Sequence, residues 1–314
     1  MLAESIVSDK LLNNKMPNSR KLPNSVIIFG CGYVGKALAE YLIGQGVRVG
    51  ALTRNADKAA DLRSFGLAEV IEAELDSHDW HSQVSGQYDA VVNCVSSAGG
   101  GLAGYRKSYV DGQRSILEWA KSQSIHSYVY TSSTSVYPQD DGVIVDETAD
   151  TSEAPPTGQV ILESEAMLAQ AGFLPNWYVL RLAGIYGAGR HYLLDQLREG
   201  AGEIPGHGDY ALNMIHLEDI VSAICAVLAG DAPSGIYNIA DDAPTTKAEV
   251  LTYLSGALNL PAPVFNPEKV SDRLKRRGGR MPHRFVSNAK AREVLGWAPM
   301  HPSFREGYGE FLKD

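Results

Sequence analysis

SVIIFGCGYVG, residues 25–35, is the stretch that decides the fold. Its first five residues form a β-branched apolar run, which is typical of a strand buried on both faces. Glycines follow at once in the pattern G-x-G-x-x-G, at Gly30, Gly32 and Gly35. Residues 36–43 then predict a helix and residues 47–52 a second strand, so the glycines stand between a strand and a helix at βαβ spacing.

This arrangement predicts a dinucleotide site rather than an ordinary glycine-rich turn. Gly30 permits the tight turn out of the strand, Gly32 lets the backbone approach a pyrophosphate, and Gly35 lets helix and strand pack closely. The N-terminus of the helix presents free N–H groups and a partial positive charge to the phosphates. We expect Tyr33 and Val34, in the same loop, to contact the cofactor as well.

The end of the second predicted strand favours NADP over NAD. An NAD site usually carries Asp or Glu there, to accept hydrogen bonds from the ribose hydroxyls. This chain has Thr53, Arg54 and Asn55 instead, and its first acid, Asp57, lies in the next predicted helix. Arg54 suits a 2′-phosphate, to which Thr53 and Asn55 can donate hydrogen bonds. The alternative is that Arg54 is a solvated surface residue.

Composition limits the classes of protein to consider. The chain has 314 residues, 44% of them hydrophobic and 21% charged, with a formal net charge of −9. These values are typical of a soluble globular protein with one large α/β domain and a smaller one. No apolar stretch approaches a membrane span, and the one dense basic run lies near residue 276. We therefore expect neither a membrane nor a nucleic-acid partner.

The three cysteines, Cys31, Cys94 and Cys225, lie far apart and form no C-x-x-C pair. This usage suits a reducing cytoplasm and gives no sign of a zinc site. We predict a cytoplasmic protein without metal ligands and leave a homodimer open.

Strands and helices alternate along most of the chain. Residues 1–24 are polar and rich in Asn and Lys, so we expect a mobile leader, with Met16 as an alternative start. Further strands are predicted at 68–73, 88–94, 127–131, 177–182 and 235–239, with helices at 56–65, 105–122, 160–171 and 217–228 and another opening at 246. The alternation predicts an α/β fold, a Rossmann doubly wound parallel sheet. Small residues at the strand ends fit a backbone beside the cofactor, and we expect contacts from Cys94, Val95, Ser96, Thr131 and Ser132.

Several ordered motifs resemble one known family. They are TSSTSVYP at 131–138, RLAGIYGAGR at 181–190, NMIHLEDI at 213–220, GIYNIAD at 235–241 and LGWAP at 295–299. With the glycine loop they resemble the extended short-chain dehydrogenase/reductases, called NAD-dependent epimerase/dehydratases, whose members mostly act on nucleotide sugars. The resemblance implies an NAD(P)-binding Rossmann domain at 25–186 plus 213–240. A smaller substrate-binding region is expected at 187–212 plus 241–314.

The expected catalytic residues depart from the family pattern. Extended members carry Tyr-x-x-x-Lys on the helix after the fifth strand, with a Glu four residues beyond the Lys. If Glu165 is that Glu, Ile161 takes the Lys position and Thr157 the Tyr position, and neither can act as acid or base. The helix that usually supplies an Asn has Tyr109 and Asp111, and the glycine loop is one residue short. The chain thus resembles the atypical branch, which keeps the cofactor fold and often loses the active-site set.

The remaining candidates are polar residues near the expected nicotinamide. Ser133 is predicted to bind a substrate carbonyl or hydroxyl, with a capping hydroxyl as the alternative. Asp111 is a weaker catalytic candidate, with surface hydrogen bonding as its alternative. Tyr137 and His216 are predicted to be structural.

Two basic segments suggest an anionic substrate. Arg190 and His191 follow the sixth predicted strand at the mouth of the expected cleft. Arg273–280 holds five basic residues and two glycines, and Arg277 and Arg280 can bind a phosphate or carboxylate bidentately. A solvated basic loop is the alternative.

Two functions remain open from the sequence. The first is an NADP-binding oxidoreductase or epimerase/dehydratase-like enzyme acting on a nucleotide sugar or another anionic small molecule. A hydride would move between nicotinamide C4 and a substrate carbon, with Ser133 orienting the substrate oxygen. The second is a non-catalytic NADP-binding protein, a redox sensor or interaction module that lost the Tyr and Lys.

Overall fold

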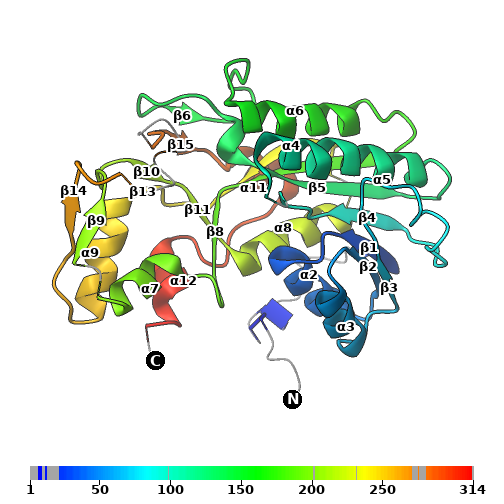
Figure 1. Ribbon diagram of the computed structural model, residues 1–314, viewed down its shortest axis with the longest axis horizontal. Coiled ribbons are helices and arrows are strands. Elements are labelled where there is room, and N and C mark those ends of the chain that lie inside the picture. The colour runs from blue at the N-terminus through cyan, green and yellow to red at the C-terminus, as the bar shows by residue number, and fades with distance from the viewer. Residues whose placement is uncertain are drawn as a thin grey trace.

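A seven-stranded parallel sheet forms the centre of the computed structural model (Figure 1). The model describes residues 6–8, 11–12, 21–97, 99–200, 202–230, 232–270, 275 and 281–312. In spatial order the strands are β12 (Gly235–Ile239), β7 (Asn176–Leu182), β5 (Ser127–Ser133), β4 (Ala90–Asn93), β1 (Ser25–Phe29), β2 (Arg48–Thr53) and β3 (Glu69–Glu72). This order confirms the predicted Rossmann doubly wound sheet.

The strand order reverses between β1 and β4. The chain runs outward from β1 through β2 to β3 and then returns to β4 on the opposite side of β1. Val26, Ile27, Ile28 and Phe29 of β1 are completely buried, as expected for the central strand of a sheet covered on both faces. Such a reversal leaves a crevice at the carboxyl ends of the strands, where ligands of this fold bind.

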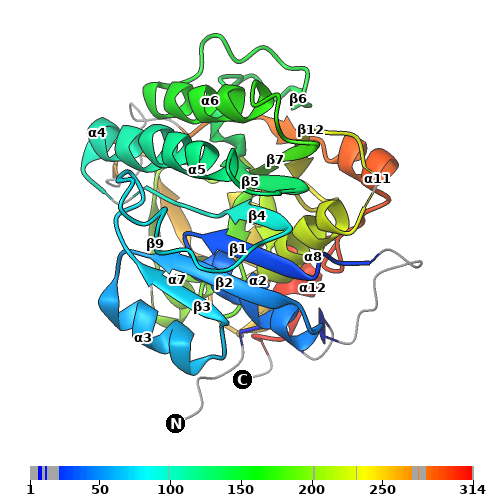
Figure 2. The same ribbon diagram turned by 90° about the vertical axis from the view of Figure 1, so that its right-hand side faces the viewer.

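Helices cover both faces of the sheet (Figure 2). On one face lie α2 (Tyr33–Gly44), α3 (Ala56–Ser64) and α8 (Leu217–Leu228); on the other lie α4 (Gly101–Tyr105), α5 (Gly112–Ala120) and α6 (Pro156–Ala169). Between α4 and α5, residues Arg106–Asp111 form a π-helical turn. The helix predicted at 105–122 is therefore longer at its start and is not regular throughout. Among the described residues, no helix has the length and apolar composition needed to cross a bilayer.

A second, smaller core lies beyond the carboxyl ends of the strands. It packs α7 (Tyr192–Arg198), α9 (Lys247–Ala257) and α12 (Phe304–Gly309) around leucines and aromatic rings. Short strand pairs surround it: β9 (Glu203–Pro205) with β14 (Val264–Asn266), β10 (Ala211–Leu212) with β13 (Thr245–Thr246), and β8 (Gly184–Tyr186) with β11 (Met214–His216). Of these elements, β8 and β11 lie within the segments expected for the Rossmann domain, and the others lie within 187–212 and 241–314.

The last part of the chain returns to the main core. β15 (Phe285–Val286) pairs with β6 (Ile144–Val145), and α11 (Ala289–Leu295) follows it. Val286, Ala291, Leu295 and Trp297 are buried in the same cluster as β1 and α8. The expected assignment of all of 241–314 to the smaller region therefore does not hold for this stretch, whose apolar side chains cover the edge strand β12.

The described part of the leader is also packed. Val7 and Leu11 are only 5% and 1% exposed and belong to the main core cluster. The Ile6 N–H donates to Glu40 Oε2 (3.1 Å), and the Ser8 N–H donates to Glu218 Oε1 (2.6 Å). The prediction of a mobile leader is wrong for residues 6–8 and 11–12, because their apolar side chains are buried against α2 and α8.

Candidate functional site

A cavity of about 450 Å³ opens at the carboxyl ends of β1, β4 and β5, where the strand order reverses. Most of the residues predicted to bind the cofactor line it. These are Gly30, Gly32, Tyr33, Val34, Thr53, Arg54, Asn55, Cys94, Val95, Ser96, Thr131 and Ser132. Ser133 and Arg190 line the same cavity, so the structure brings the cofactor residues and two of the substrate candidates into one space.

The glycine loop forms one end of the cavity. Gly30 has φ +80°, and a Cβ there would lie 2.6 Å from both the N and the Cα of Val95. A Cβ at Gly35 would lie 2.9 Å from Gly30 O, so Gly35 serves the packing of α2 and does not line the cavity. At Gly32 the nearest atom would be Gly30 O at 3.9 Å. This open side of Gly32 fits the close approach of a pyrophosphate.

The end of β2 presents cations to the cavity. The Asn55 side chain accepts a hydrogen bond from Lys58 N (2.8 Å) and thereby caps α3, while Thr53 Oγ1 accepts one from Asn55 N (3.4 Å). Both side chains thus stabilise their own turn. Arg54 and Lys58 are exposed and line the cavity. The sequence analysis did not predict Lys58 as a residue of this site. The sequence indicated this role only through the position of Lys58 in the first turn of the helix that follows Arg54.

The acidic residues that line the cavity follow β3 rather than β2. Glu74 and Asp76 follow β3 and line the cavity opposite the π-helical turn. Lys107 Nζ lies 3.3 Å from Glu74 Oε2 and 3.5 Å from Asp76 Oδ1. These carboxylates are therefore compensated by a lysine that also lines the cavity.

The hydroxyls at the end of β5 differ in what they can offer a ligand. Thr131 Oγ1 donates to Asn93 O (3.2 Å), and Ser132 Oγ donates to the buried carboxylate of Glu165 (2.5 Å). Ser133 Oγ instead accepts from Ser135 N (3.1 Å), which caps a short 3₁₀ turn. Ser133 therefore caps this turn, which was the alternative role predicted for it. Its hydroxyl proton remains available for a hydrogen bond to a ligand in the cavity.

Two cysteines line the same cavity without being reactive. Burial raises the pKa of the Cys31 thiol and of the Cys94 thiol to about 12 in each case. Both thiols are neutral near pH 7, and thiolate chemistry is not expected from either.

The positions that the sequence analysis assigned to the family's Tyr and Lys do not reach the cavity. Neither Thr157 nor Ile161 lines it, and Ile161 is 3% exposed within the main core. Glu165 is buried and forms a bidentate pair with Arg181, with distances of 3.0 Å from Nε to Oε1 and 2.7 Å from Nη2 to Oε2. Arg181 also donates to Tyr137 Oη (3.0 Å). The structural prediction for Tyr137 is confirmed, since it is 1% exposed.

Tyr109, on the π-helical turn, supplies a phenol to the cavity wall. Its oxygen accepts a hydrogen bond from Ser97 N (3.2 Å), and its ring lies 5.3 Å from that of Tyr105. Burial raises the pKa of Tyr109 to about 12, so the phenol keeps its proton at neutral pH. The sequence analysis noted Tyr109 only as the residue replacing an expected Asn and gave it no role.

Several predicted site residues are not brought to the cavity. Asp111 accepts from Arg114 Nη1 (2.8 Å) on an exposed helix face. His191 Nδ1 lies 2.8 Å from Asp195 Oδ1, and its ring packs near Phe311. Arg277 and Arg280 lie outside the described residues. Arg190 does line the cavity, with its guanidinium over the Tyr33 ring at 5.5 Å.

The sheet order and the glycine loop at its reversal define a dinucleotide-binding α/β protein of the Rossmann class. Residues 26–240 match the model of the NAD dependent epimerase/dehydratase family, and the chain belongs to that family. The predicted resemblance is therefore confirmed. The family assignment supports an NAD(P)-dependent oxidoreductase as the general class of this protein.

Individual relatives agree with this assignment. The chain is 27% identical over 305 residues to the 3-diazoavenalumate denitrifying reductase of a Streptomyces species, covering 90% of this chain and 99% of the relative. It is 30% identical over 247 residues to protein YeeZ of Escherichia coli K12, covering 76% and 86%. The structure of MoeE5 in complex with UDP-glucuronic acid and NAD superposes with a TM-score of 0.77 at 22% identity, covering 92% of this chain and 98% of that one. That likeness shows the fold.

Proposed function

We propose that this protein is an NADP-dependent reductase that transfers a hydride to the carbonyl carbon of a small anionic substrate, without the Tyr-x-x-x-Lys pair. The observation that carries the proposal is a single cavity that joins the glycine loop, Arg54, Ser133 and Tyr109. The Streptomyces relative, which matches almost end to end, is likewise a reductase.

The residues present fit the cofactor. Gly32 offers open space to a pyrophosphate at the start of α2, and Gly30 and Gly35 hold the loop in a shape that a Cβ would destroy. Arg54 and Lys58 place two cations where β2 ends, which favours a 2′-phosphate over a free ribose hydroxyl. The cofactor would supply the hydride from C4 of its nicotinamide.

Ser133 and Tyr109 would bind and protonate the substrate oxygen. Ser133 Oγ already accepts from Ser135 N, so its proton points away from that bond and can polarise a carbonyl. Tyr109 Oη likewise accepts from Ser97 N and has its proton to give. As the carbonyl carbon gains a hydride, its oxygen becomes an alkoxide, a stronger base than a phenolate whose pKa is about 12. Proton transfer from Tyr109 to that oxygen is therefore favourable and completes the alcohol.

The substrate is expected to be anionic, as in a nucleotide sugar. Arg190 lines the cavity and is the one cation that β8 and its following turn contribute to the described lining. The relative MoeE5 binds UDP-glucuronic acid on the same fold. The role of Arg277 and Arg280 in holding such an anion stays a prediction.

A second candidate, a non-catalytic NADP-binding protein, is favoured by the position of Ile161 in the core rather than in the cavity. Both candidates bind NADPH, so binding alone does not separate them. The two differ in turnover, and the outcome depends on whether Tyr109 transfers a proton.

The experiment combines a binding and a turnover measurement. Purified protein is titrated with NADPH by calorimetry and then assayed by NADPH absorbance with a panel of phosphorylated and nucleotide-linked carbonyl compounds. Tyr109→Phe should bind NADPH normally and lower kcat about 10²- to 10⁴-fold. Tyr105→Phe is the matched control, because this neighbouring ring does not line the cavity. NADPH binding without turnover of any carbonyl would favour the non-catalytic protein.

A further inference from the structure

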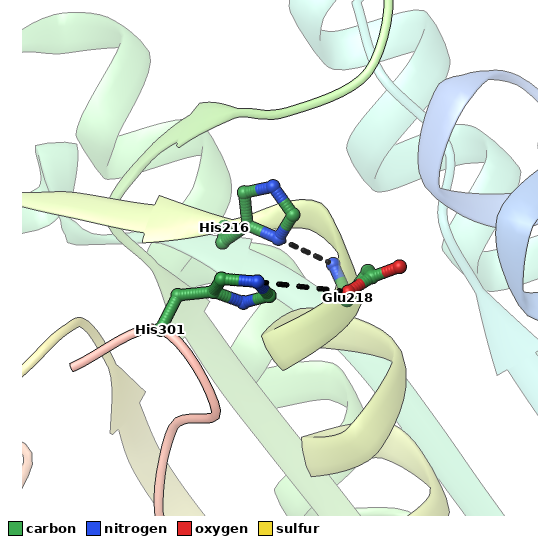
Figure 3. Close-up of side chains that lie close together, drawn as sticks. All are labelled: His216, Glu218 and His301. Carbon is green, nitrogen blue, oxygen red and sulfur yellow. Dashed lines mark hydrogen bonds and ion pairs between the residues drawn. The ribbon is translucent and has the colours of Figure 1, made fainter. Parts of the chain in front are cut away.

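A buried cluster of metal-ligating side chains lies outside the cavity lining (Figure 3). His216 ends β11, Glu218 lies in the first turn of α8, and His301 lies just before α12. The three residues are 2%, 3% and 3% exposed, and their possible ligand atoms all lie within 4.8 Å of one another. Two segments far apart in the sequence, the β11–α8 junction and the stretch before α12, thus bring two imidazoles and one carboxylate together.

One oxygen of the Glu218 carboxylate accepts a hydrogen bond, and the other faces the cluster. Oε1 accepts the short hydrogen bond from Ser8 N (2.6 Å). Oε2 is fully buried and has no hydrogen-bond partner among the described residues. His301 Nε2 lies 3.7 Å from it, which is too far for a hydrogen bond. A buried carboxylate oxygen without a partner is costly, and a bound cation would compensate it.

The ring of His301 is held by a second carboxylate. Asp219 is completely buried, and its Oδ2 lies 3.2 Å from His301 Nδ1 and also accepts from His301 N at 3.2 Å. Asp219 Oδ1 accepts from Met300 N (2.5 Å). A carboxylate on one imidazole nitrogen fixes the tautomer in which the other nitrogen can bind a metal. Here that other nitrogen is Nε2, which faces Glu218.

The local charge also favours a cation. Glu218 and Asp219 are both carboxylates in the first turn of α8, buried side by side at its N-terminus. The helix dipole offsets only part of two negative charges. Glu310 adds a further carboxylate, with Oε1 at 3.8 Å from His216 Nε2, and its side chain is 46% exposed. The cluster is thus acidic inside and reaches solvent at Glu310.

We propose that His216, Glu218 and His301 bind one divalent transition-metal ion of the Zn²⁺ class. Two imidazoles and a carboxylate form a ligand set that suits Zn²⁺, with Glu310 or water as the fourth ligand. Ligands of a tetrahedral Zn²⁺ lie about 3.4 Å apart, so binding draws the three side chains together by about 1 Å.

The site is structural rather than catalytic. None of its three ligands lines the cavity. Through Glu218 it reaches Ser8 of the leader, and through His301 it holds the segment that leads into α12. A metal ion there would clamp both ends of the described chain to α8. The sequence analysis predicted no metal ligands, because that prediction relied on cysteine spacing and His301 is far from His216 in the chain.

Metal binding can be tested on the full chain without any activity assay. The protein is stripped with EDTA, dialysed, and titrated with Zn²⁺ by calorimetry and with Co²⁺ by visible absorption. We expect one ion per chain, a Co²⁺ spectrum of four-coordinate type, and a higher Tm in the Zn²⁺ form. Zn²⁺ X-ray absorption of the wild type should report two imidazole ligands, which keeps the test independent of any variant that fails to fold.

Variants then locate the site. Glu218→Gln and His301→Gln should each weaken Zn²⁺ binding at least about 100-fold, and Asp219→Asn about 10- to 100-fold. His78→Gln is the control, because the exposed His78 stacks on the half-buried His81, and this pair of rings could bind Zn²⁺ adventitiously. Loss of binding in His78→Gln but not in His301→Gln would overturn the proposal. So would a wild type that binds no Zn²⁺.

Discussion

The two ends of the cavity are built from different parts of the chain. At the glycine-loop end, backbone packs on backbone, and the closest approaches involve Gly30, Gly35 and the main chain of Val95. At the opposite wall, single side chains such as Ser133 and Tyr109 project from a strand end and a π-helical turn, each with one backbone hydrogen bond. The first end depends on the absence of side chains and the second on their identity.

This difference determines how freely each end of the cavity can change. A glycine that any Cβ would push into backbone cannot be exchanged without moving the chain beside it. A proton donor can be exchanged for another donor that reaches the same space. If Thr157 and Ile161 take the positions of the family's Tyr and Lys, as the sequence predicts, the chemistry of those positions can change while the fold around β1 stays the same.

The largest expected effect is at Gly30. Gly30→Ala places a Cβ 2.6 Å from the Val95 backbone at a φ of +80°, so both the loop and β4 must shift. We expect NADPH affinity to fall more than about 100-fold and the free energy of unfolding by about 3 kcal/mol. Gly46→Ala is the matched control: its φ is +77° and its Cβ meets nothing within 4 Å. That variant should cost about 1 kcal/mol and leave NADPH binding intact, as measured by urea unfolding and calorimetry. Equal effects of the two variants would show that backbone packing is not what holds this end.

A smaller loss is expected at the opposite wall. Ser133→Ala should lower kcat about 100-fold, because it removes one donor to the developing negative charge on the substrate oxygen. Thr157→Val should leave activity nearly unchanged, because Thr157 does not line the cavity. Steady-state kinetics of both variants with the same carbonyl substrate compares the two positions. A collapse of activity in Thr157→Val would return the catalytic role to the position of the family's Tyr.

The pH dependence of kcat sharpens the assignment of Tyr109. Burial raises the pKa of this phenol from its ordinary value of 10.0 to about 12. A general acid works while it is protonated, so its raised pKa moves any loss of activity to higher pH. We expect kcat to be constant between about pH 7 and 10, measured over the range where the fold is intact. A basic limb centred near about pH 8 would assign the proton to another group.

A more moderate effect is expected at the end of β2. Arg54→Ala should weaken NADPH binding roughly tenfold, the value of a charge-assisted contact to phosphate, and leave NADH binding nearly unchanged. Arg63→Ala, in the helix α3 that follows Arg54, is the control, because Arg63 does not line the cavity. Calorimetric titration of both cofactors decides the question. Equal affinities of the wild type for NADPH and NADH would exclude a 2′-phosphate site here.

The smallest effect is expected at Asp111. Its carboxylate pairs with Arg114 on an exposed helix face, and exposed pairs contribute little. Asp111→Asn should change neither kcat nor NADPH affinity and should move the free energy of unfolding by less than about 0.5 kcal/mol. A large drop in kcat would restore the catalytic role that the sequence suggested.

The fold was largely predictable, because its evidence is local. Each central strand is a short apolar run, and the glycine pattern stands directly between β1 and α2, so periodicity and turn chemistry agree. The packed leader was missed because Val7 and Leu11 lie in an otherwise polar segment. Their burial depends on α2 and α8, which only the folded chain brings together.

The candidate site was predictable only where it consists of strand ends. Arg54 follows β2 directly and Ser133 is the last residue of β5, and strand ends meet at one edge of the sheet. Asp111 and His191 were chosen for their chemistry and sequence neighbours, and each pairs instead with a residue on its own helix. Tyr109 was not assigned a role, because the direction of a side chain on an irregular helix cannot be obtained from regular helical spacing.

The π-helical turn at Arg106–Asp111 has a practical consequence for protein engineering. An i→i+5 turn accommodates one more residue than an α-helical turn. Deleting Ser108 would return this stretch to α-helical spacing. The preceding helix α4, which has no buried residue, would shift to close the gap in the chain. Helix α5 would keep its contacts with the core, while the ring of Tyr109 would be turned to another direction. The direction of a phenol could thus be redesigned by one deletion, at the cost of a single serine of the cavity lining.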